Sequence, residues 1–301
     1  MSDQGSFLVV GGDSLVGGET VLALSRRGHR VFSTTRRRNT VNHQRVFLDF
    51  ESEELFRAPD GVEYAFVIAA ATNYDRCESD PRARVINVEL IPRLVASLIE
   101  QGVFVSVISS NSVFGGERPW PHEDDPHFPG IAYARQKSEA ERAVHAAAER
   151  LKAPDRTNVV RLTKILNPDV SPLPAWLSAW NEKKSIAPFS DLIFAPMSAK
   201  FAGESLSIIG EKRIPGNLHL SGAANVTYVD LAYALAERLN IATTQIEPTT
   251  ALARGIKIPF KPTYSGLGMA RTTKLSGIEP QGLDGLVDHL CEQINVRIKD
   301  R

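Results

Sequence analysis

The sequence predicts an α/β fold, a doubly wound parallel sheet with a smaller, irregular C-terminal lobe. Short apolar runs alternate with amphipathic segments through the first half of the chain. A glycine-rich turn joins the first run to the first helix, and prolines become frequent after residue 166. The core is expected to span 1–166 and to be joined again by about 217–240. Residues 167–216 and 241–301 are expected to form mainly the lobe and a C-terminal helix.

The strands are expected at the apolar, β-branched runs, in order 7–10, 31–35, 46–48, 64–70, 103–109, 158–163 and 217–221. Run 64–70 is wholly apolar, as in a strand that is covered on both faces. Helical spacing predicts helices over 19–27, 85–101, 132–152, 228–239 and 283–298, and Gly28 is a suitable end for the first. Strands and helices in this order are typical of a parallel sheet.

Composition excludes several classes of protein. Of 301 residues, 43% are hydrophobic, which excludes wholesale disorder, and 35 Lys and Arg balance 35 Asp and Glu, which argues against binding of nucleic acid or an anionic membrane through bulk charge. Cys77 and Cys291 lie far apart, so neither a disulfide framework nor a metal site is expected. The N-terminus lacks a signal-peptide pattern and no apolar run is long enough to span a bilayer, so a cytoplasmic location is expected.

The turn after the first strand predicts a dinucleotide site. Its pattern, Gly11-x-x-Ser14-x-x-Gly17, lets the backbone approach a pyrophosphate at a helix N-terminus, where free N–H groups favour anions. A glycine-rich turn without a ligand is the alternative. The residues expected to bind the cofactor here are Gly11, Asp13, Ser14, Leu15, Val16 and Gly17.

The end of the second strand favours NADP over NAD. A carboxylate is expected there in an NAD site, but the strand runs into Arg36, Arg37 and Arg38, whose guanidinium groups suit a 2′-phosphate. A solvated basic turn is the alternative, and NAD stays open as the cofactor. Asp49, followed by Phe50 after the third strand, is expected to accept a hydrogen bond from the adenine amino group, with an exposed loop residue as the alternative.

Tyr133 and Lys137 open the long helix at a spacing that places both side chains on one face. An ammonium within about 4–6 Å favours the phenolate and lowers a tyrosine pKa, so the pair is suited to acid/base chemistry. An ordinary surface helix face is the alternative. Ser109, Ser110 and Ser112 follow the fifth strand, where a hydroxyl can polarise a carbonyl or merely cap the strand end.

Together these residues resemble the extended short-chain dehydrogenase/reductase family, and within it the sugar-nucleotide-binding branch that is dTDP-4-dehydrorhamnose reductase-like. The resemblance covers nearly the whole chain and is carried, beside Tyr133 and Lys137, by segments 69–78, 85–87, 110–114, 161–163, 218–231 and 272–278. It implies a Rossmann NAD(P)-binding core with a substrate lobe. Ser14 departs from the family, which has glycine there, and so does segment 164–167.

The resemblance also implies a role for each matching residue. Hydride passes from the nicotinamide to a carbonyl carbon, and Tyr133 protonates the alkoxide that forms. Lys137 binds the nicotinamide ribose and tunes Tyr133, and Ser110 donates a hydrogen bond to the substrate oxygen. Asn87 is carried over as a structural and proton-relay position. The small side chains of Ala69, Ala70 and Ala71 are expected to pass beside the cofactor.

The function expected is therefore NADP-dependent reduction of a carbonyl on a small molecule similar to a nucleotide-linked sugar. An epimerase or dehydratase that retains NAD(P), and a non-catalytic nucleotide-binding regulatory subunit, are the alternatives. The family resemblance allows a homodimer. The sequence does not specify the natural substrate, because the proline-rich lobe would select it.

Overall fold

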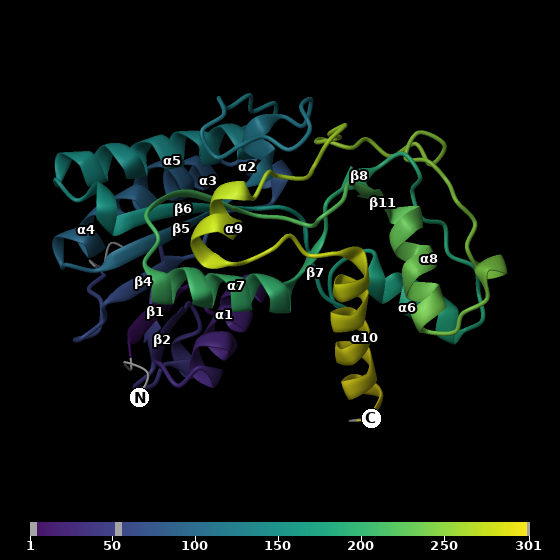
Figure 1. The fold of residues 1–301 in the computed structure, drawn as a ribbon, viewed down its shortest axis with the longest axis horizontal. Coiled ribbons are helices and arrows are strands. Elements are labelled where there is room, and N and C mark those ends of the chain that lie inside the picture. The colour runs from purple at the N-terminus through teal and green to yellow at the C-terminus, as the bar shows by residue number, and fades with distance from the viewer. Residues whose placement is uncertain (1–4, 52–55, 300–301) are drawn as a thin grey trace.

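The central sheet has seven parallel strands in the order β10-β6-β5-β4-β1-β2-β3 (Figure 1). This computed structural model describes residues 5–51 and 56–299. The strands are β1 Ser6–Val10, β2 Arg30–Thr35, β3 Arg45–Phe47, β4 Tyr64–Val67, β5 Phe104–Ser110, β6 Thr157–Leu162 and β10 Gly216–Leu220. The predicted doubly wound fold is confirmed. Strand order reverses between β1 and β4, and ligands bind outside the carboxyl ends of strands at such a point.

Helices cover both faces of the sheet. α1 Leu15–Arg26 packs with α7 Ala199–Lys212 on one face, and α4 Ile91–Glu100 packs with α5 Ala132–Arg150 on the other (Figure 1). Successive β1 side chains alternate between the two buried cores, with Phe7 and Val9 in one and Leu8 and Val10 in the other. Between β4 and α4 the chain forms α2 Tyr74–Ser79, α3 Pro81–Arg84 and a π-helical turn, Val85–Leu90.

A smaller lobe lies beside the sheet. Its helices are α6 Leu173–Asn181, α8 Tyr228–Arg238 and α10 Leu283–Lys299, and β8 Ile193–Phe194 pairs with β11 Val226–Thr227 (Figure 1). Trp176 and Trp180 are buried in the core of this lobe. Two short strands, β7 Ile165–Leu166 and β9 Met197–Ser198, pair where the chain leaves β6, and α9 Ala270–Ser276 packs against β10. None of the described helices has the length and apolar character needed to cross a membrane.

Two helices, α7 and α8, pack against partners that lie far along the chain. α7, within 167–216, packs on α1 of the core, and a Cβ at Gly203 would lie 2.6 Å from the Glu19 carbonyl carbon, so this close approach requires glycine. α8, within 217–240, packs instead against α10. α6 arises in a stretch expected to be loop, because its proline occupies the first turn, where no N–H is needed.

Candidate active site

A cavity of about 880 Å³ opens at the carboxyl ends of β1, β2, β4, β5 and β6. It runs from the glycine turn after β1 to the start of α5, so one site is continuous from the predicted dinucleotide loop to the predicted acid/base pair. Its lining includes Gly11, Asp13, Ser14, Leu15, Val16, Arg36, Arg37, Asp49, Phe50, Ala69, Ala70, Ala71, Ser110, Tyr133 and Lys137. Two expected site residues, Gly17 and Asn87, are not part of the lining.

The glycine turn needs glycine at two positions, because the chain packs closely on itself there. Gly11 has φ +95°, and a Cβ there would lie 2.7 Å from the Ala69 nitrogen. A Cβ at Gly17 would lie 2.1 Å from the Gly11 carbonyl oxygen. Ser14 is the N-cap of α1, because its hydroxyl accepts from Gly17 N at 3.1 Å and donates to Gly11 O at 2.7 Å. The serine in place of glycine therefore closes the turn, and α1 begins at Leu15 rather than at residue 19.

At the end of β2 the structure places a carboxylate that the strand itself lacks. Asp13, from the glycine turn, accepts a hydrogen bond from the Thr35 hydroxyl at 2.7 Å. The same carboxylate pairs with the Arg45 guanidinium and lies 3.8 Å from Arg37 Nε. Arg36 lines the cavity beside Arg37. The end of β2 therefore carries the Asp13 carboxylate beside arginines, although the sequence predicts only arginines there.

Asp49 and Phe50, which follow β3, and Ala69 to Ala71, which follow β4, also line the cavity. The three alanines present only small side chains to the cavity, and their place beside a cofactor stays a prediction. Arg76 also lines the cavity and pairs with Glu51 at 3.2 Å and with Asp80 at 2.9 Å. Hydrogen bonding of Asp49 to an adenine stays a prediction.

Ser110 ends β5 and caps the short 3₁₀ turn that follows, Asn111–Phe114. Its Oγ accepts from the Ser112 backbone N–H at 3.2 Å and lies 3.0 Å from Ser112 Oγ, which is fully buried. The Ser112 hydroxyl donates to Ser110, and the Ser110 hydroxyl itself donates to Asn111 Oδ1 over a longer distance of 3.4 Å, at the lining of the cavity. The geometry is suited to donation to a substrate oxygen.

Tyr133 lies in the first turn of α5 and is almost fully buried. Burial raises the pKa of Tyr133 above its ordinary value, and this effect exceeds the opposite influence of the Ser110 hydroxyl. The ring of Tyr74 packs on Tyr133 with centroids 5.3 Å apart. The sequence-based expectation that Lys137 lowers this pKa is therefore wrong for the structure described, and the phenol is held in its protonated form.

Lys137 lies one turn after Tyr133 and is also buried. Its Nζ donates to the Ile108 carbonyl at 2.8 Å, which fixes the amine beside the end of β5. Burial lowers the pKa of Lys137 to about 8, although the nearby Glu141 carboxylate acts in the opposite direction. The amine is thus placed to titrate close to neutral pH.

Asn87 lies in the π-helical turn, behind the cavity wall. Its amide accepts from Ala71 N and donates to Ala71 O, both at 2.9 Å, and donates to Gln136 Oε1 at 2.8 Å. The side chain therefore positions the main chain at Ala71 and the first turn of α5. Its part in proton transfer stays a prediction.

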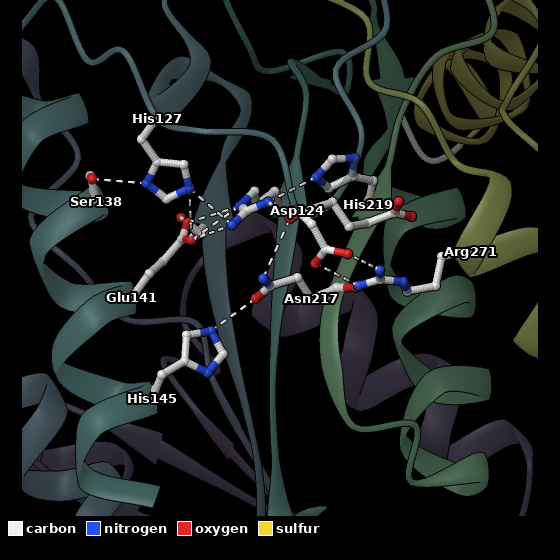
Figure 2. Close-up of polar contacts among 11 residues, drawn as sticks. Asp124, His127, Ser138, Glu141, His145, Asn217, His219 and Arg271 are labelled. Atoms are coloured by element: carbon white, nitrogen blue, oxygen red, sulfur yellow. Dashed lines mark hydrogen bonds and ion pairs between the residues drawn. The ribbon is translucent and has the colours of Figure 1, made fainter. Parts of the chain in front are cut away.

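A buried network of charges and imidazoles supports the catalytic side (Figure 2). Arg161 of β6 and Glu141 of α5 are only 2% and 3% exposed, with Nη2 2.7 Å from Oε2. The Ser109 hydroxyl donates to Glu141, so the network reaches the strand end beside Ser110. Arg161 also contacts the imidazole Nε2 of His127 at 3.0 Å and of His219 at 3.1 Å. Burial lowers the pKa of His219 to about 3, which keeps this ring neutral.

Sequence reasoning missed some of the residues that support this site. Glu141 was not singled out, because a carboxylate in a charged helix is common, whereas Ser112 was among the hydroxyls noted after the fifth strand. The helical spacing from Lys137 to Glu141 places them on one face, and that spacing was the usable signal. The glycine turn with its helix N-terminus, the cavity length and the placed amine fit a nicotinamide dinucleotide.

A family model, that of the RmlD substrate binding domain, matches residues 5–295. A search of curated proteins finds no match. Among solved structures, MoeE5 in complex with UDP-glucose and NAD has a TM-score of 0.79 at 19% identity, covering 98% of this chain and 100% of the other. These values show a shared fold over the full length of both chains.

Two solved dTDP-4-dehydrorhamnose reductases are also similar in fold. That from Yersinia enterocolitica has a TM-score of 0.76 at 22% identity, covering 95% of this chain and 100% of the other. That from Bacillus anthracis, in complex with NADP, has a TM-score of 0.78 at 16% identity, covering 97% and 99%. Solved structures of this fold thus include complexes with NAD and with NADP.

Proposed function

Because the chain belongs to the RmlD substrate binding domain family, we propose that it reduces a carbonyl on a nucleotide-linked sugar with a nicotinamide coenzyme, NADP ahead of NAD. The observation that carries the proposal is that Ser110, Tyr133 and Lys137 line one cavity with the glycine turn. Arg36 and Arg37 at the adenosine end support NADP. The partner proposed for this cavity is a small molecule, rather than a nucleic acid or a membrane.

Each residue has a part that follows from its placement. The bound nicotinamide supplies the hydride. Ser110 donates a hydrogen bond to the carbonyl oxygen and so stabilises the negative charge that develops there. Tyr133 gives its proton to that oxygen, and the raised pKa of Tyr133 keeps the proton on the phenol until then. We assign to Lys137 the binding of the nicotinamide ribose, and the hydrogen bond that fixes its Nζ at the Ile108 carbonyl supports this role.

The test is reduction of nucleotide-linked 4-keto sugars, followed by the loss of reduced coenzyme. Tyr133→Phe is expected to lower the rate by about 10²–10⁴-fold while coenzyme still binds, because a positioned acid contributes that much. Tyr74→Phe is the matched control, since it removes the neighbouring phenol, keeps the ring packed on Tyr133 and should retain most of the activity. Equal rates for wild type and Tyr133→Phe would contradict the proposal.

An epimerase or dehydratase that retains its coenzyme is the second candidate, and Asp13 favours it, because a carboxylate near the end of β2 suits NAD. The residue after Asn111 is Ser112, without the carboxylate that a dehydratase would need near this strand. Coenzyme that copurifies and is restored in each turnover would establish the second candidate. Binding of NADP without turnover of any carbonyl would instead indicate the non-catalytic alternative.

A further inference from the structure

Asp13 stands in an unusual place for a carboxylate. It belongs to the turn that receives a pyrophosphate, yet its side chain turns to the end of β2, where it accepts from Thr35 Oγ1 at 2.7 Å. Arg45, from the start of β3, pairs with Oδ1, and Arg37 Nε lies 3.8 Å from Oδ2. The side chain stays 25% exposed and lines the cavity. This cluster is called the Asp13 clamp: Asp13, Thr35, Arg37 and Arg45.

We propose that the Asp13 clamp sets the coenzyme preference of this chain, with Asp13 as the specificity-determining residue. Its carboxylate accepts a hydrogen bond from the 2′-hydroxyl of an adenosine ribose. It also keeps the guanidinium groups of Arg37 and Arg45 from a 2′-phosphate. The inference rests on the proposed function, since it concerns the coenzyme site of that same cavity. It implies that the chain accepts NAD as well as NADP, despite three consecutive arginines after β2.

Several hydrogen bonds fix the side chains of the Asp13 clamp in place. The Thr35 hydroxyl donates to Asp13 and accepts from the Arg37 backbone N–H at 3.0 Å, so one side chain orients both partners. The neighbouring Thr34 hydroxyl accepts from Gly11 N at 2.9 Å and holds the glycine turn against β2. Arg45 Nε is buried and has no hydrogen-bond partner within the described ranges, so Arg45 depends on the Asp13 carboxylate.

Charge arithmetic gives the direction of the effect. A phosphate with nearly two negative charges near Asp13 is repelled, whereas a hydroxyl at the same place donates a charge-assisted hydrogen bond. Asp13 offsets one of the two positive charges of Arg37 and Arg45, while Arg36 pairs with no carboxylate in the part of the chain that the structure describes. Release of the clamp therefore frees two guanidinium groups for a phosphate and removes the acceptor for a hydroxyl.

The experiment is direct measurement of the Kd of NADP and of NAD by titration, with no turnover required. Asp13→Asn keeps the side-chain size and is expected to tighten NADP and weaken NAD, so the affinity ratio shifts toward NADP by about tenfold or more. Glu63→Gln is the matched control, because Glu63 also pairs with an arginine, Arg213, but at the opposite end of the sheet. Its ratio should equal that of wild type.

A double-mutant cycle tests whether Asp13 restrains Arg37. Arg37→Met should weaken NADP more in the Asp13→Asn background than in wild type, where the clamp already occupies Arg37. Thr35→Val gives a second route to the same result, since it removes the hydroxyl that orients Asp13 and should shift the ratio in the same direction. Thermal unfolding of each variant establishes that it is folded.

The outcomes separate the two proposals. If wild type binds neither coenzyme, the proposed function fails. If it binds both and Asp13→Asn leaves the ratio unchanged, the proposed function stands and the role of Asp13 is overturned. An Arg37→Met effect of equal size in both backgrounds would likewise overturn the restraint of Arg37 by Asp13.

Discussion

The ion pairs near the two ends of the cavity differ in their exposure to solvent. Near the proposed catalytic end, the Arg161–Glu141 pair is almost wholly buried, and the Ser109 hydroxyl, the Glu123 carbonyl and the rings of His127 and His219 also contact it. At the coenzyme end, the Asp13 clamp keeps Asp13 and Arg45 partly in contact with solvent. Removing one partner of a buried pair leaves an uncompensated charge, whereas an exposed pair is replaced by water at little cost. The buried Arg161–Glu141 pair therefore fixes the geometry around it, whereas the charges of the partly exposed Asp13 clamp can be changed at little cost in stability.

The largest effect is expected where the buried pair is broken. Glu141→Gln leaves the Arg161 guanidinium buried without a counter-charge and should lower the free energy of unfolding by about 3–5 kcal/mol. Denaturant unfolding measures the change. Glu139→Gln, on the same helix, is the control because Glu139 pairs with Arg84 at the surface. Similar losses in the two variants would contradict the distinction between the two environments.

The next largest effect concerns Lys137. Burial lowers its pKa to about 8, so the folded protein holds this proton less tightly than the unfolded chain does. The protonated amine costs stability below pH 8, and the cost is lost as the pH rises toward the ordinary lysine pKa. Lys137→Met should therefore be more stable than wild type by on the order of 3 kcal/mol at pH 7.

Thermal or denaturant unfolding from pH 7 to 10.5 checks this prediction. The difference between Lys137→Met and wild type should shrink steadily across that range, while catalysis is lost in the variant at every pH. A constant difference would show that lost contacts, not the buried charge, account for the change.

The sequence is informative about the fold because alternation of strands and helices depends on local spacing. It also places Gly11, Ser110, Tyr133 and Lys137 at one sheet edge, since parallel strands end together. The raised pKa of Tyr133 and the carboxylate of Asp13 at β2 depend on burial and on side-chain direction across 22 residues of sequence. Local patterns do not encode such directions. The packing of α7 on α1 and of α8 on α10 also depends on partners that lie far along the chain.

A smaller effect is expected at Arg36, which lies outside the Asp13 clamp. Arg36→Asp should weaken NADP binding by about tenfold or more without a comparable loss for NAD, because the new carboxylate repels the 2′-phosphate but accepts a hydrogen bond from a 2′-hydroxyl. Equilibrium titration measures both affinities. Arg30→Asp is the control, since Arg30 begins the same strand at its opposite end. If Arg36→Asp leaves NADP affinity unchanged, the basic turn plays no part in coenzyme choice.

The smallest effect is expected at an exposed ion pair within the region of the buried network. Asp124 is 71% exposed and pairs with Arg271 (Figure 2), whereas the Arg161–Glu141 pair is almost fully buried. Arg271 lowers the pKa of Asp124, so the contribution of the pair is present at neutral pH and is lost as the pH falls through that lowered value. Because solvent screens this pair, Asp124→Asn should cost about 0.5 kcal/mol or less at pH 7. Denaturant unfolding at pH 7 and at acid pH checks both statements, and a loss comparable to that of Glu141→Gln would mean that burial does not separate the two pairs.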